Sequence, residues 1–198
     1  MALRSRLQPW LVAVWQERGF VAHLLLPLAW ITGALRAWSA WRYRGGARAQ
    51  RLPVPVVVVG NLYVGGTGKT PLTIELVRGL RARGRTPGIV SRGYGSRSSV
   101  AREVDPRGAA ADYGDEPMLL AQAAKVPVVV GHDRVAAGRL LLNLHPSIDV
   151  IIADDGLQHL RLARQVEIAL VHYRGFGNGW LLPAGPLRDP PTRLASVD

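Results

Sequence analysis

Residues 65–70 read Gly-Gly-Thr-Gly-Lys-Thr, a combination suited to holding a polyphosphate. Glycines allow successive backbone N–H groups to turn toward an anion. Lys69 can reach the β and γ oxygens of a nucleotide, and the Thr70 hydroxyl can ligate Mg²⁺. The loop therefore predicts a bound nucleotide with Mg²⁺. The residues predicted to contact the nucleotide are Tyr63, Val64, Gly65, Gly66, Thr67, Gly68, Lys69 and Thr70.

This loop departs from the strict phosphate-loop pattern, which has glycine five residues before Gly68, where this chain has Tyr63. Gly60 and the doubled glycine at 65 and 66 partly offset the departure. An incidental Gly-rich turn is the alternative. The apolar run 56–59 before the loop and the helical pattern 71–83 after it favour the phosphate loop, since a helix N-terminus attracts anions.

A second acidic group follows another apolar run, 149–153, as Asp154-Asp155-Gly156. A carboxylate at the end of a strand beside the phosphate-loop strand can hold Mg²⁺ directly or through water. Adjacent residues point in different directions, so one aspartate could face the metal while the other orients a loop. The alternative is a turn of the Asp-Asp-Gly type.

Asp115 opens a helical pattern in the segment Gly-Asp-Glu-Pro, residues 114–117. Its carboxylate could accept a proton from an attacking hydroxyl, which is general-base chemistry. The spacing is equally compatible with a helix cap, with Pro117 in the first turn. The spacing alone does not decide between the two interpretations.

Other polar residues follow predicted strands without forming a ligand set. Arg92 could contact phosphate and Tyr94 could stack on a sugar or base, although a plain loop fits equally well. The segment at His132 and the segment at His159 are interpreted as structural or solvent-facing.

The elements that must position these residues alternate between short apolar runs and helical patterns. Continuous apolar runs are typical of strands buried on both faces, and their alternation with helices predicts a parallel sheet flanked by helices, as in P-loop NTPases. Ligands of such sheets bind at the carboxyl ends of the strands. Strands are predicted at 56–59, 86–91, 126–130, 149–153 and 166–171, helices at 71–83, 116–124 and 134–144, and loops at 92–113 and 175–191.

The chain divides into an N-terminal segment 1–41, a basic linker 42–55 and a core domain 56–198. The formal net charge is +11, and residues 1–51 carry +7 of it through eight arginines and one acid. The chain has no cysteine, which excludes disulfides, thiol catalysis and Cys-ligated zinc.

Residues 19–35 lack charged side chains, and five of the six tryptophans lie within the first 41 residues. Tryptophan prefers the membrane–water boundary, and clustered arginine attracts anionic headgroups. We therefore predict contact with an anionic membrane surface and no nucleic-acid partner, and no protein partner is indicated. A short spanning anchor and a helix lying in the membrane plane both remain open. Packing of a helical pair on the core is the alternative.

Taken together, the ordered motifs resemble the bacterial tetraacyldisaccharide 4'-kinase family, and the resemblance covers essentially the whole chain. The matching segments are 60–71 (GNLYVGGTGKTP), 91–95 (SRGYG), 114–117 (GDEP), 133–137 (DRVAA), 154–159 (DDGLQH) and 177–190 (GNGWLLPAGPLRDP).

The resemblance implies transfer of the γ-phosphate of ATP to the 4'-hydroxyl of an acylated disaccharide 1-phosphate, a step of lipid A biosynthesis at the cytoplasmic face of the inner membrane. It implies Asp115 as the base, with Lys69 also catalytic, and Asp154 and Asp155 with Thr70 on the metal side. Substrate contacts are expected from Asn61, Arg92, Tyr94, Arg188 and Asp189. Family members usually continue into a further lobe with a histidine that supports the base, so this chain is expected to lack that lobe.

Two other functions remain open from the sequence. A metallochaperone-type P-loop NTPase would be expected to carry a His or Cys cluster, and none is visible. A membrane-bound nucleotide-binding module without catalysis is the other.

Overall fold

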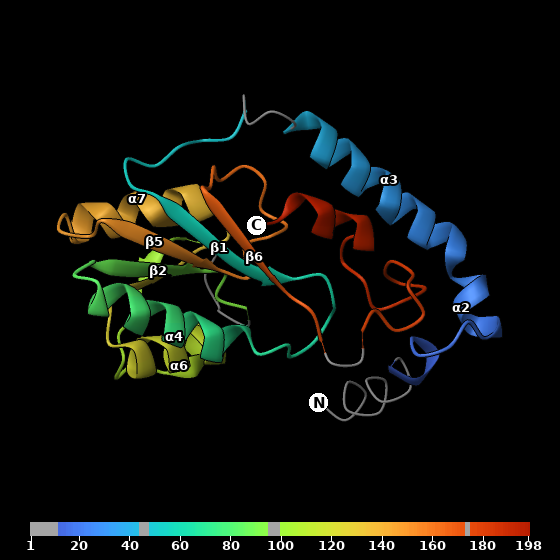
Figure 1. Ribbon diagram of the computed structural model, residues 1–198. Coiled ribbons are helices and arrows are strands. Elements are labelled where there is room, and N and C mark those ends of the chain that lie inside the picture. The colour runs from blue at the N-terminus through green and yellow to red at the C-terminus, as the bar shows by residue number, and fades with distance from the viewer. Residues whose placement is uncertain (1–11, 44–47, 95–99, 173–174) are drawn as a thin grey trace. The chain divides into compact units, whose positions relative to one another are not determined.

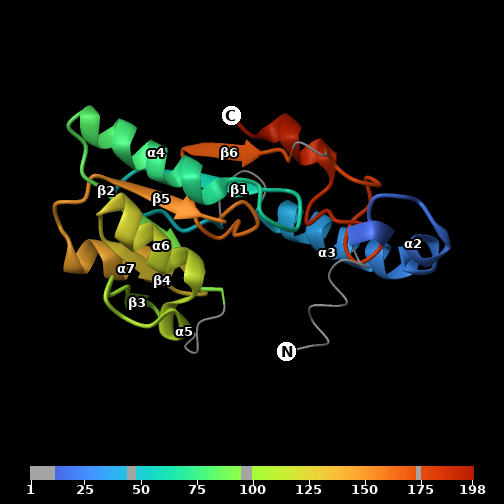
Figure 2. The ribbon, with the colours of Figure 1, turned by 90° about the horizontal axis from the view of Figure 1, so that it is seen from below.

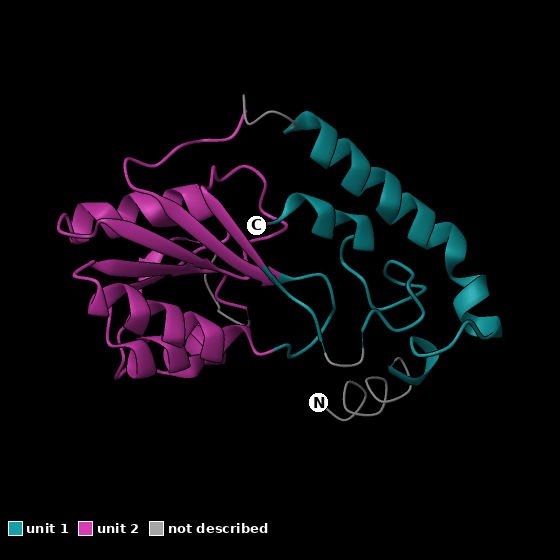
Figure 3. Cartoon of the chain, viewed as in Figure 1, with its two compact units in different colours: residues 1–44, 61–67, 169–197 teal, residues 45–60, 68–168, 198 magenta. Residues whose placement is uncertain are grey.

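A computed structural model of the protein describes residues 12–43, 48–94, 100–172 and 175–198. The chain folds into two compact units, each assembled from separated stretches (Figure 3). One, here called the helix-loop unit, comprises residues 1–44, 61–67 and 169–197. The other, here called the sheet unit, comprises residues 45–60, 68–168 and 198.

A six-stranded sheet dominates the fold, with strand order β3-β4-β2-β5-β1-β6 (Figure 1). Strand β5 pairs in parallel with both β1 and β2, and β2 pairs in parallel with β4. Strand β3 pairs antiparallel with β4. The strands are β1 (Val56–Asn61), β2 (Pro87–Ser91), β3 (Arg102–Glu103), β4 (Val128–Val130), β5 (Val150–Asp154) and β6 (Val166–Leu170).

The central strands are buried on both faces, as their continuous apolar runs predict. Val58, Ile89 and Ile152 are fully buried. Helix α7 covers one face of the sheet, and α4 and α6 cover the other (Figure 1). The helices of this part are α4 (Lys69–Ala82), α5 (Ala110–Tyr113), α6 (Asp115–Ala124) and α7 (Arg134–Leu144). The predicted parallel-dominated sheet flanked by helices is confirmed.

Most element limits differ from the sequence prediction by one or two residues, and one loop prediction was wrong. The segment 92–113, predicted to be all loop, contains β3 and α5, which lie beyond β4 in Figure 2. Strand β3 forms by pairing with β4, and Arg102 also donates to the carbonyl of Asp112 in α5. The ring of Tyr113 lies 4.7 Å from the Arg102 guanidinium. Such contacts are tertiary, so local sequence patterns do not predict them.

The helix-loop unit contains α2 (Phe20–Leu24), α3 (Leu26–Arg42) and the 3-10 helix η2 (Pro191–Ser196). The uncharged stretch 19–35 therefore forms two helices, which meet at Leu25. Pro27 lies in the first turn of α3, where a missing N–H costs nothing. Across the described ranges, no helix combines the length and apolar character needed to cross a bilayer.

Hydrogen bonds to backbone carbonyls hold the loop 177–189 against α3 and the segment before α2, and also within itself. Trp15 donates its indole N–H to the carbonyl of Pro183 over 3.0 Å, and the Thr32 hydroxyl donates to the carbonyl of Leu182. The buried Asn178 amide donates to the carbonyl of Ala184 over 2.9 Å. The loop therefore has a defined path, although it lacks regular secondary structure.

The helices α2 and α3 leave many large apolar side chains exposed. Phe20 is 83% exposed and Trp30 is 70% exposed, whereas Ala29 on another side of α3 is buried. The others are Leu24, Leu28, Ile31, Leu35, Trp38 and Trp41. Apolar patches of this kind mark interaction surfaces.

Candidate active site

Lys69 and the aspartate pair come together at the carboxyl ends of two neighbouring strands. Lys69 is the first residue of α4, and its buried Nζ lies 3.6 Å from Oδ1 of Asp155. Asp155 directly follows β5, which pairs in parallel with β1. The arrangement places a fixed cation and a carboxylate together at the N-terminus of a helix, where anions are favoured.

Asp154 has one carboxylate oxygen available for a further ligand. The side chain is buried, and its Oδ2 accepts a hydrogen bond from the Ser91 hydroxyl over 3.3 Å. Its Oδ1 is also buried and has no hydrogen-bond partner within the described part of the chain. Burial, followed by the negative charges of Glu116 and Asp155, raises the pKa of Asp154 to about 6. A cation at Oδ1 would satisfy the oxygen and favour the charged carboxylate.

Asp155 adopts a left-handed backbone conformation, with φ at +49°. Arg134 supports this turn, because its Nη2 donates to the carbonyl of Asp155 over 3.3 Å and its Nη1 to the carbonyl of Gly131 over 3.1 Å. Arg134 is buried, and that burial lowers its pKa to about 10. Arg134 lies in the matching segment 133–137, but no role was predicted for it from the sequence. Its position after β4, at the same edge as the aspartates, was the available signal.

Asp115 is the first residue of α6 rather than its cap. Gly114 occupies the capping position with φ at +94°, and no side chain caps the helix. A Cβ at Gly114 would lie 2.4 Å from the carbonyl oxygen of Tyr94, so glycine permits this close approach to the loop after β2. The capping interpretation of Asp115 is therefore wrong. The Asp115 side chain is exposed.

The first turn of α6 lies near the aspartate pair. Glu116 raises the pKa of Asp154 through its charge, which requires proximity between the two carboxylates. The loop carrying Arg92 and Tyr94 also lies near this edge, since the positive charge of Arg92 contributes to lowering the pKa of the buried Arg134. Arg92 and Tyr94 are both exposed. The sheet unit therefore gathers Asp115, Lys69 and the aspartates at one edge.

His159 lies on the segment that follows the aspartate pair and is partly buried beside Arg134. Burial, followed by the positive charge of Arg134, lowers the pKa of His159 to about 4, so the ring is neutral at pH 7. Its Nε2 is buried and has no hydrogen-bond partner in the described ranges. Asp133 nearby caps α7 by accepting from the backbone N–H of Val135 over 2.9 Å.

The glycines of the phosphate loop are exposed and surrounded by open space. Gly65 has φ at +127°, and a Cβ at Gly65 or Gly66 would meet no atom within 4 Å. Gly68 caps α4 with φ at +83°. Exposed backbone N–H groups with space above them are what a polyphosphate requires.

Asn61 was expected to contact substrate, but it is fully buried. Its amide instead donates to the carbonyl of Tyr63 over 2.7 Å and to the Thr67 hydroxyl over 2.8 Å. The expectation failed because a buried side chain satisfied by its own loop has no free surface for a substrate.

Arg188 and Asp189 lie in the helix-loop unit. The backbone N–H of Arg188 donates to the carbonyl of Leu62 over 2.6 Å, and Oδ1 of Asp189 lies 3.8 Å from Nε of Arg36 on α3. Asp189 is therefore paired with a residue of the N-terminal helices.

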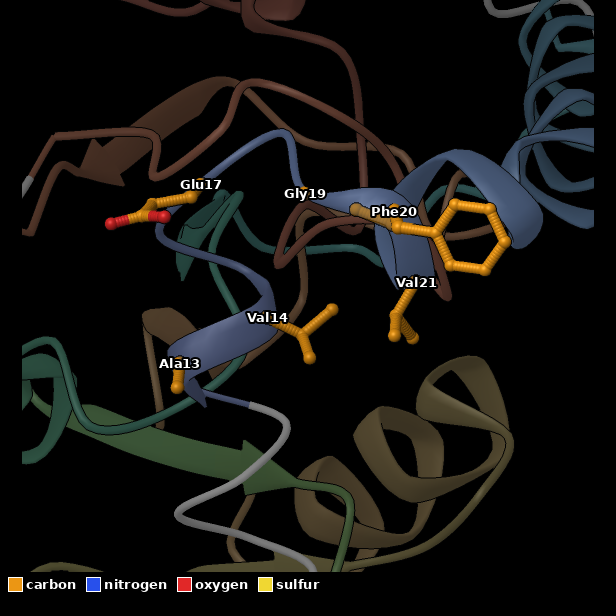
Figure 4. Close-up of a pocket in the computed structure, with 7 residues that line it drawn as sticks. Ala13, Val14, Glu17, Gly19, Phe20 and Val21 are labelled. Atoms are coloured by element: carbon orange, nitrogen blue, oxygen red, sulfur yellow. The ribbon is translucent and has the colours of Figure 1, made fainter.

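A shallow, mostly apolar pocket lies in the N-terminal part of the same unit (Figure 4). Val14 and Val21 face the same space in this view. Its lining consists of Ala13, Val14, Glu17, Gly19, Phe20, Val21 and Ala22. It lies next to the exposed apolar residues of α2.

Comparison with known proteins identifies the family. The family model described as LpxK, tetraacyldisaccharide-1-P 4'-kinase, matches residues 21–198. The chain belongs to this family. A tetraacyldisaccharide 4'-kinase from Janthinobacterium sp. is 56% identical over 98% of this chain, and one from Herminiimonas arsenicoxydans is 56% identical over 96%.

A solved structure supports the same assignment. The LpxK of Aquifex aeolicus, described as an apo form in complex with ATP, superimposes with a TM-score of 0.82 at 33% identity. The match covers 90% of this chain and 57% of that chain. This chain spans 56% of the Janthinobacterium relative and 54% of the Herminiimonas relative, so it corresponds to about half of the length of these family members.

Proposed function

We propose that this chain forms the nucleotide-binding part of a kinase that transfers the γ-phosphate of ATP to the 4'-hydroxyl of a tetraacylated glucosamine disaccharide 1-phosphate, in lipid A biosynthesis. The observation that carries the proposal is the pairing of Lys69 with Asp155 beside the unsatisfied oxygen of Asp154. The family membership and the ATP named for the Aquifex relative support it.

The residues present fit Mg²⁺-ATP. Mg²⁺ prefers oxygen ligands and is usually held by one or two carboxylates together with substrate phosphates. Asp154 offers a buried free oxygen, and Thr70, the second residue of α4, offers a hydroxyl. When bound, Mg²⁺ would neutralise charge that develops on the phosphate oxygens.

The chain's own residues would position and activate the reactants. Lys69 would hold the β and γ phosphates, and its pairing with Asp155 fixes where the ammonium lies. Asp115, exposed at the start of α6, would accept the proton of the attacking hydroxyl. Arg92 and Tyr94 are proposed to contact the acceptor, because they are exposed on the loop beside Gly114.

The direct test is incubation with labelled ATP, Mg²⁺ and a panel of acylated glucosamine disaccharides. We expect label on the tetraacylated acceptor and about a hundredfold loss or more in Lys69→Ala, since one preorganised electrostatic contact is worth about 10²–10³ in rate. Lys125→Ala, the same change outside the site, is the control. Hydrolysis of ATP without transfer to any acceptor would favour an NTPase instead.

We also propose that α2 and α3 lie in the plane of an anionic membrane at the cytoplasmic face. The exposed Trp30 and Trp38 support this, as does the arginine-rich composition of residues 1–51. Replacing both tryptophans with Gln should release the protein from sedimenting anionic vesicles. Replacing the similarly exposed Leu119 and Leu144 with Gln should not. Equal binding of all three proteins would place the membrane contact elsewhere.

A further inference from the structure

The buried Asn61 is the residue that shapes the phosphate loop. Asn61 ends β1 and is fully buried. Its Nδ2 donates to the carbonyl of Tyr63 over 2.7 Å and to the Thr67 hydroxyl over 2.8 Å, with the carbonyl of Gly65 at 3.5 Å. One amide group thus joins the beginning, the middle and the end of the segment 63–67.

The outer side of the loop is fixed independently. Tyr63 forms an antiparallel bridge with Leu187, and the N–H of Val64 donates to the carbonyl of Pro186 over 2.9 Å. The Tyr63 ring stacks on His172 with 5.4 Å between centroids. Within the described ranges, this backbone ladder ends at Val64 and does not reach the exposed Gly65 and Gly66 or the half-buried Thr67.

The exposed glycines make this remaining part costly to order. Glycine loses more conformational freedom than any other residue when its backbone is fixed. Gly65 and Gly66 meet no atom where a Cβ would lie, so packing does not hold them. The strict pattern has glycine at position 63, where this chain has Tyr63, and the backbone carbonyl of Tyr63 accepts a hydrogen bond from Asn61.

We propose that Asn61 is a positioning residue that preorganises residues 65–67 for phosphate, through its bonds to Tyr63 and Thr67. The proposal rests on the proposed ATP-binding function. Asn61 does not touch the nucleotide. It lowers the entropy that the loop loses on binding, so its removal weakens phosphate binding while the sheet remains folded.

The test uses the whole chain and two readouts. Thr67→Val removes the acceptor hydroxyl, Thr67→Ser retains it, and Asn61→Leu removes the donor at similar size. We expect Mg²⁺-ATP affinity to fall about tenfold in Thr67→Val and in Asn61→Leu, the scale of one or two lost hydrogen bonds, and to remain near the parent value in Thr67→Ser. The double variant should lose no more than Asn61→Leu alone, because Asn61→Leu already removes the contact with Thr67.

Hydrogen exchange without nucleotide provides the second readout. The amides of residues 65–67 should exchange about tenfold faster in Thr67→Val and Asn61→Leu than in the parent and Thr67→Ser. Asn143→Leu, on the exposed surface of α7, is the control and should change neither readout. If Asn61→Leu does not fold, the two Thr67 variants decide.

The outcomes separate the two proposals. A parent chain that does not bind Mg²⁺-ATP contradicts the proposed function, whereas the exchange rates still test Asn61. Equal exchange rates in Thr67→Val and Thr67→Ser, with parent-like rates in Asn61→Leu if it folds, would overturn the positioning role.

Discussion

The two units of this chain are stabilised in different ways. The sheet unit has a core of interlocked Val, Ile and Leu side chains, in which Val58, Ile89 and Ile152 are fully buried. The helix-loop unit also buries Leu62 and Leu187, and in addition it is joined by single hydrogen bonds to loop carbonyls, such as those from Trp15 and Asn178. It also leaves the apolar surface of α2 and α3 exposed. The sheet unit therefore buries most of its large apolar residues, whereas the helix-loop unit leaves many of them exposed.

The charged groups follow the same division. The sheet unit buries Lys69, Arg134 and Asp154, which is costly unless each charge is paired or has a function. In the helix-loop unit, the ion pair of Arg36 with Asp189 is partly exposed, with Arg36 at 40%. The buried charges of the sheet unit therefore mark the region where phosphate chemistry is expected.

The largest expected effect concerns Asp115. Asp115→Asn removes a base but conserves size. Loss of the negative charge in the first turn of α6 costs only about 0.3–1 kcal/mol of stability. Removal of a positioned general base typically costs about 10²–10⁴ in rate. We expect turnover to fall by that factor, with ATP affinity and thermal unfolding near the parent values.

The measurement compares initial rates of phosphate transfer for parent and variant in a background where the parent is active. Asp112→Asn, on the short helix α5, is the matched control and should retain parent turnover. A parent-like rate in Asp115→Asn would show that the base lies elsewhere, with Asp154 and Asp155 the next candidates.

The second prediction concerns the buried titrating groups of the sheet unit, without Mg²⁺ or nucleotide. The pKa of Asp154 is raised to about 6, so the folded state binds its proton more tightly than the unfolded state does. The stabilisation that results is complete below pH 3.8, the usual pKa of the group, and is lost as the pH rises through 6. The free energy of unfolding that is lost over this pH range is about 3 kcal/mol. The pKa of His159 is lowered to about 4, so its contribution is complete above 6.5 and is lost as pH falls toward 4.

Between pH 4 and 6, Asp154 lowers the free energy of unfolding as the pH rises, whereas His159 raises it. In Asp154→Asn, unfolding free energy should rise more steeply with pH than in the parent, because the opposing group is absent. In His159→Gln it should rise less steeply or fall. Urea unfolding at a series of pH values measures these slopes. Identical slopes in all three proteins would contradict the buried environment of both groups.

Part of the fold and of the candidate site could be predicted from the sequence. The strands and helices followed from apolar runs and helical spacing, and α7 begins and ends where the pattern indicated. The phosphate loop and the aspartate pair followed from residue types at strand ends. The burial of Arg134 and Asn61 did not, because whether a polar side chain faces solvent depends on segments distant in sequence. Strand β3 was missed for the same reason.

The third prediction tests how closely the core of the sheet unit is packed. A Cβ at Gly88 in β2 would lie 2.6 Å from Ile148 and 2.8 Å from Leu141. Gly88→Ala should therefore overpack the core and destabilise the protein by about 1–3 kcal/mol. Gly66→Ala, where no neighbour lies within 4 Å, is the control. Equal unfolding midpoints for the two variants would show that the core adapts to the added methyl group.

The smallest expected effect concerns the helix-loop unit. Asn178 donates to the carbonyls of Ala184 and Glu17, and its Oδ1 accepts from the N–H of Trp180. Asn178→Ala leaves these groups unpaired at a buried position, at a cost of about 1–2 kcal/mol. Because the hydrogen bonds of Asn178 all lie within the helix-loop unit, the cost should appear as local opening rather than global unfolding. Hydrogen exchange should accelerate at Gly179, Gly185 and Leu187, while the amides of β2 and β5 keep parent rates. Uniform acceleration in both units would mean that the two are not energetically separate, and the contrast between a packed sheet and a hydrogen-bonded loop would then not govern stability.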